Sequence, residues 1–95
     1  MKEDLDTASD KISSFFPSTP ILLDYHLTKR LGRPTYLKLE NLQATGSFKV
    51  RGALNCMANL TPELLSQGVV TCSSGNQGRA VATVANMLGV AATVC

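Results

Sequence analysis

One lysine in this sequence stands where its amine could do chemistry. Residues 45–52 read TGSFKVRG, so that a turn dipeptide and a serine precede Phe48 and Lys49. The hydrophobic pattern predicts that a helix begins here, and a cation in a first helical turn faces the unfavourable end of the helix dipole, at a cost of roughly 0.3 to 1 kcal/mol. In a partly desolvated cleft, the amine would move toward its neutral, nucleophilic form, which can form a Schiff base. The alternative interpretation is an exposed lysine whose stem lies along the surface.

A second polar segment, SSGNQG at residues 73–78, follows a predicted strand and precedes a predicted helix. Free backbone NH groups and the positive end of the helix dipole favour an anion at such a place. The glycines let the backbone approach a ligand closely, and Ser73, Ser74 and Asn76 add side-chain hydrogen bonds. The segment lacks the spacing of a dinucleotide site and the ending of a P-loop, so no nucleotide site is indicated. Either an anion site or a tight turn that caps the helix explains it.

The elements that would position these residues follow from the hydrophobic pattern. Helices are expected over residues 4–16, 48–60, 62–67 and 79–88, and strands over 35–40, 69–73 and 90–95. Ser47 is expected to cap the helix that carries Lys49. The order strand, glycine turn, helix, strand after residue 68 predicts a βαβ unit with a parallel sheet, and so an α/β fold. Cys72 and Cys95 lie in these predicted strands and are expected to be buried.

Composition and charge exclude several classes of function. The chain has 95 residues, 44% hydrophobic and 17% charged, which suits one domain or part of one. The net charge is only +2 and the basic residues are scattered, so no nucleic-acid or membrane partner is indicated. The three cysteines form no CxxC pair, so neither a disulfide framework nor a metal site is indicated. Acidic residues near the N-terminus do not suit a secretory signal, and a cytoplasmic protein is expected.

Taken together, the two motifs resemble those of the fold type II pyridoxal-phosphate enzymes (tryptophan synthase β-like), in the branch of threonine/serine dehydratases and serine racemases. GSFKVRGA at residues 46–53 is similar to the lysine motif of that branch, and SSGNQGRA at 73–80 is similar to its substrate loop. STPILL and YLKLENLQATG are similar to the segments that precede the lysine. The resemblance implies a three-layer α/β fold, a parallel sheet with helices on both faces, of which this chain is the N-terminal portion.

The resemblance also implies roles for the matching residues, with pyridoxal 5'-phosphate as the cofactor. Lys49 would hold the cofactor as a Schiff base and later take the substrate α-proton. Phe48 would pack beside the cofactor ring, and Asn76 would reach its 3'-oxygen. Ser74 would also be catalytic, because racemases of this branch carry a serine there, on the ring face opposite the lysine, whereas many dehydratases carry alanine. The residues that would bind the substrate, largely through backbone NH groups on its α-carboxylate, are Ser73, Ser74, Gly75, Asn76 and Gln77.

The sequence departs from the family pattern at two positions in the loop. Gln77 replaces the histidine, phenylalanine or tyrosine often found after the loop asparagine, and Arg79 replaces a common glutamine. Both changes leave the substrate preference open. Arg79 followed by alanines also resembles the dehydratases of hydroxyectoine breakdown. The form FKVRG differs from the VKDR-like motif of cysteine-synthase relatives, which argues against β-replacement chemistry.

Polar residues outside the motifs receive structural interpretations. His26 stands alone in a polar turn. Glu40 and Asn41 end a predicted strand near the lysine loop, where turn formation is favoured over a role in the site. Arg51 is expected to point elsewhere on the helix and to pair with an acidic neighbour.

The resemblance predicts a dehydratase, or ammonia-lyase, of amino-acid metabolism. It would perform α,β-elimination on threonine or serine and release a 2-oxo acid and ammonia. A serine racemase, or a hydroxyectoine-pathway dehydratase that takes another hydroxy amino acid, is the alternative. When full length, the protein would bind a small hydroxy amino acid and form a homo-oligomer. The particular substrate, the oligomeric state and any activation by metal or nucleotide depend on residues outside this sequence.

The resemblance divides the chain into two parts. Residues 1–60 would belong to the large cofactor domain, and residues 68–95 would begin the small substrate-loop domain. A parallel sheet needs further strands and covering helices, so we expect a chain truncated within a strand at Cys95. The glycine-rich phosphate cradle of the family and its partner for the pyridine nitrogen are not among these residues. An inactive truncated fragment without catalysis is therefore a hypothesis of a different class.

Overall fold

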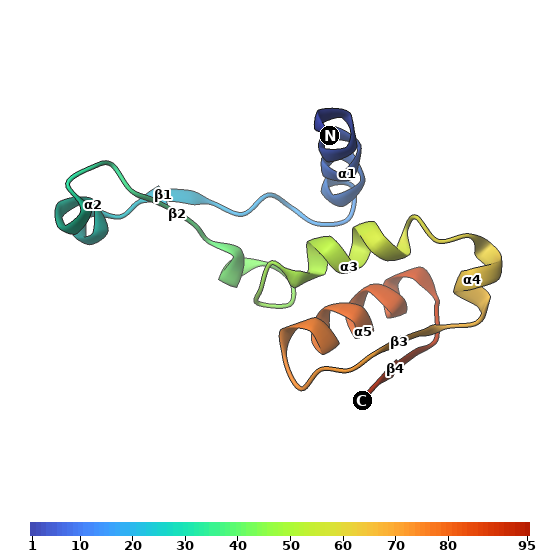
Figure 1. Ribbon diagram of the computed structural model, residues 1–95. Coiled ribbons are helices and arrows are strands. Elements are labelled where there is room, and N and C mark those ends of the chain that lie inside the picture. Colours follow the sequence, from blue (N-terminus) through green and yellow to red (C-terminus); the bar gives the residue numbers. More distant parts are fainter.

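The chain folds into a mixed arrangement of helices and strands, as the sequence predicts. Figure 1 shows the computed structural model, which describes residues 1–95. No helix has both the length and the apolar character needed to cross a membrane. The elements in chain order are α1 (Lys2–Ser13), β1 (Ile21–Leu23), α2 (Tyr25–Leu31), β2 (Tyr36–Lys38), the 3-10 turn η1 (Glu40–Leu42), α3 (Lys49–Met57), α4 (Pro62–Ser66), β3 (Val69–Thr71), α5 (Asn76–Leu88) and β4 (Ala92–Val94).

The first two strands and the helix between them form an arm. Strands β1 and β2 pair antiparallel, with Ile21 opposite Lys38, and every residue of both strands is exposed. Asp24 caps the N-terminus of α2, since its side chain accepts a hydrogen bond of 2.7 Å from the backbone NH of Leu27, and Gly32 caps the C-terminus in the left-handed conformation. The arm extends to one side, away from α3 and α5 (Figure 1).

The last part of the chain is the predicted βαβ unit. Strands β3 and β4 pair in parallel, with Val69 opposite Ala92, and α5 connects them. The backbone NH of Ser73 donates a 2.9 Å hydrogen bond to the carbonyl oxygen of Cys95, so the pairing continues past β3. Gly89 ends α5 in the left-handed conformation, with φ of 68°. The predicted strand, glycine turn, helix and strand are therefore all present in the predicted order.

The core lies where α3 packs against α5 (Figure 1). Helix α3 contributes a stripe of apolar residues at helical spacing, and small alanines on α5 allow a close approach. The buried core residues are Phe16, Val50, Ala53, Leu54, Met57, Ala80, Val81, Val84 and Ala85. The two helices run in the same sense, so their N-termini lie at the same end of the pair (Figure 1). This packing brings the predicted lysine helix and the predicted substrate loop together.

Several predicted boundaries need correction. Helix α5 begins at Asn76, three residues before the predicted start at Arg79, because the polar residues and the glycine before Arg79 resembled a loop. Phe48 occupies the N-cap position of α3, where no side chain caps the helix, so the prediction of Ser47 as the cap is wrong. Ser47 accepts only a long bond of 3.4 Å from the backbone NH of Lys49.

The predicted burial of two cysteines is also wrong. Cys72 and Cys95 are exposed, as is Cys56 on α3. A sheet of two strands covered by one helix leaves its other face open, so residues near the strand ends remain in contact with solvent.

Candidate functional site

Lys49 is the first residue of α3, and its side chain is exposed. Two neighbours set this orientation: Val50 and Leu54 are fully buried on the core face of the same helix, so the lysine faces away from the core. The Lys49 Nζ lies 5.2 Å from the centre of the Phe48 ring, within reach of a cation–π contact. The amine makes no ion pair, and its position leaves it accessible to a small molecule.

A cavity of about 500 Å³ opens beside Lys49, between α3, β3 and the start of α5. Three of the predicted site residues line it, namely Phe48, Lys49 and Gln77. Most of the remaining wall is apolar and comes from α3 and β3, and Arg51 adds a cationic side chain to it. A mostly apolar cavity of this size with a few polar groups suits a small organic ligand.

The other predicted loop residues lie on the neighbouring surface. Ser73, Ser74 and Gly75 line a shallower hollow of about 300 Å³ together with Arg79. Asn76 is exposed and lines neither hollow. The structure thus brings Gln77 into one cavity with Lys49 and places the serines beside that cavity, around the turn that begins α5.

The N-terminus of α5 has free capacity for an anion. No side chain caps this helix, and the first NH groups of an α-helix have no partner within it. The Ser73 hydroxyl accepts a 3.2 Å bond from the NH of Gly75 and so holds the turn rather than the helix. Exposed Asn76 and Gln77 provide the first NH groups of α5, at the positive end of its dipole.

Gly78 has a packing role that the sequence alone did not indicate. A Cβ atom at this position would lie 2.8 Å from the carbonyl oxygen of Ser73 and 2.9 Å from Cγ1 of Val94. Glycine therefore lets the first turn of α5 pack directly on the ends of β3 and β4. The sequence had suggested close approach of a ligand to the backbone here, whereas the close contact is with the sheet.

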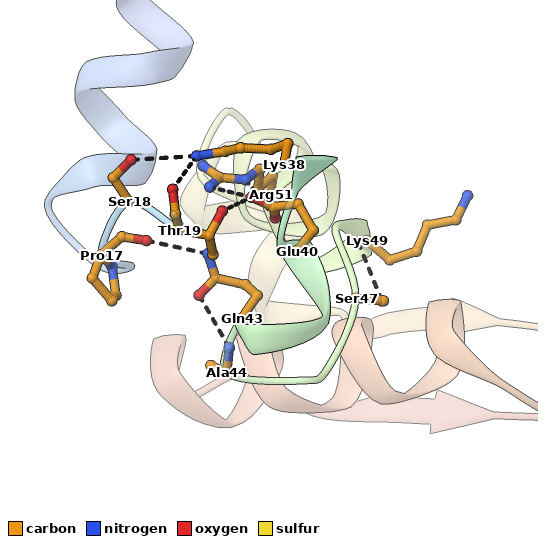
Figure 2. A network of polar contacts seen from close by, with 10 residues as sticks. All are labelled: Pro17, Ser18, Thr19, Lys38, Glu40, Gln43, Ala44, Ser47, Lys49 and Arg51. Carbon is orange, nitrogen blue, oxygen red and sulfur yellow. Dashed lines mark hydrogen bonds and ion pairs between the residues drawn. The ribbon is translucent and has the colours of Figure 1, made fainter. Parts of the chain in front are cut away.

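A cluster of polar contacts joins α3 to η1 and to the segment before β1, and Lys49 points away from it (Figure 2). Its centre is an ion pair: Arg51 donates from Nε to Glu40 Oε2 at 2.8 Å and from Nη2 to Glu40 Oε1 at 2.7 Å. Thr19 adds a third bond of 2.6 Å to Glu40 Oε1. The hydrogen bonds from Arg51 lower the pKa of Glu40 to about 2, more than burial raises it, and Glu40 in turn raises the pKa of Arg51.

Further bonds join the cluster to the chain before β1. Gln43, a buried residue, donates a 3.2 Å bond to the carbonyl oxygen of Pro17, and its own Oε1 accepts a 3.0 Å bond from the NH of Ala44. Lys38 donates to Ser18 and to the carbonyl oxygen of Thr19. The segment 17–20 is thereby bonded to the end of the arm and to the turn before Lys49.

The sequence predicted only part of this cluster. The expected pairing of Arg51 with an acidic neighbour is confirmed. Glu40 was expected to form a turn, and it does begin η1, but its carboxylate also bonds to α3. Thr19 and Gln43 were missed, because polar residues in loops give no periodic signal that marks them as buried.

One hydroxyl in the lysine turn remains without a partner. Thr45 is buried, and its Oγ1 makes no hydrogen bond. A buried hydroxyl without a partner costs about 1 to 3 kcal/mol. The turn that precedes Lys49 therefore contains one buried polar group without a partner, and Thr45 lines neither hollow.

This chain belongs to the family of pyridoxal-phosphate dependent enzymes, whose pattern matches residues 12–95. Within the family it is similar to threonine dehydratases and serine racemases, as the two motifs predicted. It is 45% identical over 87 residues to an L-threonine ammonia-lyase of Geobacter sulfurreducens, covering 92% of this chain and 22% of the relative. It is 44% identical over 87 residues to an L-threo-3-hydroxyaspartate ammonia-lyase of Saccharomyces cerevisiae, covering 92% of this chain and 27% of the relative.

Solved structures give the same family and the same fold. Serine racemase from Dictyostelium discoideum superposes with a TM-score of 0.90 at 41% identity, covering 97% of this chain and 30% of that one. Maize serine racemase superposes with a TM-score of 0.89 at 35% identity, covering 97% of this chain and 29% of that one. The chain thus spans less than a third of the length of these relatives and has the N-terminal portion of the fold type II architecture.

The residues present fit the cofactor that gives the family its name. Pyridoxal phosphate carries an aldehyde, a flat ring and an anionic group. Lys49 offers an accessible amine to the aldehyde, and Phe48 offers an exposed ring beside it. No feature of the cavity opposes the cofactor.

Proposed function

We propose that residues 1–95 supply the lysine and the substrate loop of a pyridoxal-phosphate-dependent ammonia-lyase. The enzyme would act on threonine or serine by α,β-elimination and release a 2-oxo acid and ammonia. One observation carries this proposal: the accessible amine of Lys49 and the first turn of α5 line the same cavity, at the same end of two packed helices. The threonine ammonia-lyase of Geobacter sulfurreducens, 45% identical to this chain, supports the same activity.

Each residue of the two motifs would have a separate role in the reaction. When bound, the cofactor supplies an electron sink that stabilises negative charge on the substrate α-carbon. Lys49 would hold the cofactor through its Nζ and, once the substrate amine has replaced Nζ on the cofactor, the freed amine would take the α-proton, while Phe48 would pack beside the ring. The NH groups of residues 73–77 hold the α-carboxylate at the helix N-terminus, so that the bond to the α-proton faces Lys49. Asn76 adds a side-chain hydrogen bond to the cofactor oxygen.

Racemization of serine is the second candidate. Ser74 is exposed in the loop that lines the hollow beside the cavity, and a hydroxyl there could exchange a proton on the face of the substrate opposite Lys49. The similarity to serine racemase from Dictyostelium discoideum supports this candidate. The ratio of released ammonia to D-serine formed from L-serine distinguishes elimination from racemization.

The choice of substrate would depend on the start of α5. Arg79 is exposed and lines the hollow with Ser73 and Ser74, so a cation stands next to the proposed carboxylate site. A hydroxy amino acid other than threonine, including the substrate of a hydroxyectoine-pathway dehydratase, remains part of the proposal. The L-threo-3-hydroxyaspartate ammonia-lyase of yeast, 44% identical to this chain, is a reason to include acidic hydroxy amino acids in a screen.

We also propose that the two predicted parts are separate domains. Residues 1–60 would belong to the cofactor domain and residues 68–95 to the substrate-loop domain. The packing of α3 on α5 would then be the contact between them, and the cavity beside Lys49 would open at their boundary. Active sites at domain boundaries are common for small-molecule enzymes.

The first test is an absorbance scan of the complete protein with pyridoxal phosphate. The parent is expected to give the visible band of lysine-bound cofactor, and Lys49→Ala is expected to lose it. Lys29→Ala, which removes an exposed lysine of α2, is the matched control and should keep the band. Equal bands in the parent and in Lys49→Ala would reject Lys49 as the cofactor lysine.

The same scan on residues 1–95 alone tests the hypothesis of an inactive fragment. The phosphate cradle expected from the family resemblance is not among these residues, so we expect weak cofactor binding and no release of ammonia from threonine or serine. Ammonia release by residues 1–95 that Lys49→Ala abolishes would contradict this hypothesis.

A further inference from the structure

We propose that Glu40 and Arg51 are positioning residues for Lys49: their two-point ion pair fixes the rotation of the first turn of α3, so that the lysine amine points into the cavity. The inference rests on the proposed function of Lys49. Arg51 also lines the cavity beside Lys49, but the role assigned to the pair acts through Lys49 and does not need contact with the cofactor or the substrate.

The pair has the geometry of a rigid attachment. Two nitrogens of the Arg51 guanidinium bond to the two oxygens of the Glu40 carboxylate, at 2.8 and 2.7 Å. The side chains are 29% and 15% exposed, respectively, so solvent competes little for these bonds. Because both groups are planar, two parallel bonds fix their relative orientation as well as their distance. A single bond from a flexible lysine would fix only the distance.

Because Arg51 and Lys49 lie on the same helix, fixing the direction of Arg51 also fixes the direction of Lys49. Successive residues of an α-helix are about 100° apart around its axis, so Arg51 points about 200° away from Lys49. Val50, between them, is fully buried in the core. Figure 2 shows Arg51 directed into the polar cluster and Lys49 directed away from it. With Arg51 held on one side, the first turn cannot rotate without moving the lysine out of the cavity.

The ion pair also closes the turn that carries the lysine motif. Glu40 begins η1 and Arg51 lies in α3, so the pair joins the two ends of the segment that contains Lys49. Within this segment Gly46 has φ of 76°, a conformation that glycine adopts easily, and η1 is only three residues long. Regular structure therefore constrains the turn little, and the bonds at its ends, with those of Gln43 inside it, restrict its conformations.

The test measures the reactivity of Lys49 rather than turnover. The complete protein is exposed briefly to pyridoxal phosphate and reduced with borohydride, and the label on each lysine is quantified by peptide mass spectrometry. Lys29, an exposed lysine on α2, is the internal reference. The variants are Glu40→Gln, Arg51→Met and Arg51→Lys. Asp24→Asn is the matched control, because it removes a different hydrogen-bonded carboxylate, which accepts from the backbone NH of Leu27, far from Lys49 along the arm.

We expect the ratio of Lys49 label to Lys29 label to fall about tenfold in Glu40→Gln and Arg51→Met, because small misplacements of a reacting group have large effects on rate. Arg51→Lys keeps the charge but loses the two-point geometry, so we expect its ratio of Lys49 label to Lys29 label to fall about threefold. Asp24→Asn should keep the parent ratio. Thermal unfolding of each variant shows whether it is folded, and Arg51→Lys keeps the test valid if the stronger substitutions do not fold.

Two results would overturn the positioning role. One is an unchanged ratio in folded Arg51→Lys and Glu40→Gln, and the other is an equal fall in Asp24→Asn, which would mean that any loss of stability lowers the reactivity. A parent protein that labels Lys49 no faster than Lys29 is a different result. It would reject the proposed function of Lys49 and the positioning role with it.

Discussion

The β1–α2–β2 arm and the α3–α5 helix pair bury their side chains very differently. No residue of β1, α2 or β2 is buried, and large apolar side chains such as Tyr25 and Tyr36 are exposed. The helix pair, in contrast, contributes eight of the nine core residues. Most of the stability of residues 1–95 therefore comes from the helix pair, whereas local hydrogen bonds hold the arm together.

Lys49 lies where these two regions meet. The helix pair gives it a rigid base through Val50 and Leu54, and the arm reaches the same turn through Glu40, which follows β2. The comparison suggests that substitutions in the helix pair change global stability, that substitutions in the arm act locally, and that the Glu40–Arg51 bond is the connection between the two.

The largest effect is expected from Leu54→Ala. Leu54 is fully buried between α3 and α5, and such a truncation costs about 2 to 5 kcal/mol of unfolding free energy. With so small a core, we expect residues 1–95 to lose cooperative unfolding. Leu22→Ala in β1, where the side chain is 55% exposed, should change the unfolding free energy by only about 0.5 kcal/mol. Urea denaturation followed by circular dichroism checks both, and similar losses would contradict the proposed difference between the regions.

An intermediate effect on the free energy of unfolding is expected from low pH, because protonation of Glu40 removes its ion pair with Arg51. The pKa of Glu40 is lowered from 4.5 to about 2, chiefly by hydrogen bonds from Arg51 and with smaller contributions from Thr19 and Lys38. A carboxyl whose pKa is lower in the folded chain stabilises the fold above its unfolded pKa, and this contribution is lost as pH falls through the folded value. The ion pair should therefore contribute about 1 to 2 kcal/mol near neutral pH, after allowance for its partial exposure.

Glu40→Gln isolates this contribution. The difference in unfolding free energy between parent and variant should be constant above about pH 5 and should shrink as pH falls from about 4.5 toward 2. Denaturation curves recorded across this range measure it. If the difference between parent and variant stays constant down to about pH 2, the pair does not hold the carboxylate in its charged form.

The smallest and most local effect is expected from Asp24→Ala in the arm. This substitution removes the side-chain cap of α2, which is typically worth about 1 kcal/mol. Amide hydrogen exchange should become faster over Tyr25–Leu31 and stay unchanged over Lys49–Met57. Faster exchange in both helices would mean that the arm and the helix pair unfold as one unit.

The sequence predicted the helix pair better than the arm, for a physical reason. Helix α3 and the βαβ unit have long apolar patterns with clear ends, such as Gly89 and the Thr61–Pro62 pair, in which Thr61 caps α4. Strand β1 is only three residues long and has no alternation, so its antiparallel pairing with β2 was not predicted. That pairing depends on contacts between segments that are distant along the chain.

The two motifs predicted residues of the candidate site, but the sequence did not predict the residues that hold these motifs in place. Lys49, Phe48 and Gln77 were identified and share one cavity. Gly78 was assigned to a ligand although it packs on the sheet, because a glycine in a turn does not reveal what approaches it. Thr19 and Gln43 were missed because their partners lie 21 and 26 residues away along the chain.

Because of these long-range bonds, the lysine motif depends on residues outside it for its conformation. Residues 46–53 contain the amine and Arg51, but the carboxylate that Arg51 binds lies at residue 40 and that carboxylate also bonds to Thr19. A designer who transplants GSFKVRGA into another scaffold would transfer a guanidinium without its partner. The graft would need an acceptor in the place of Glu40, and a hydroxyl beside that acceptor, before the transferred lysine could be expected to hold its orientation.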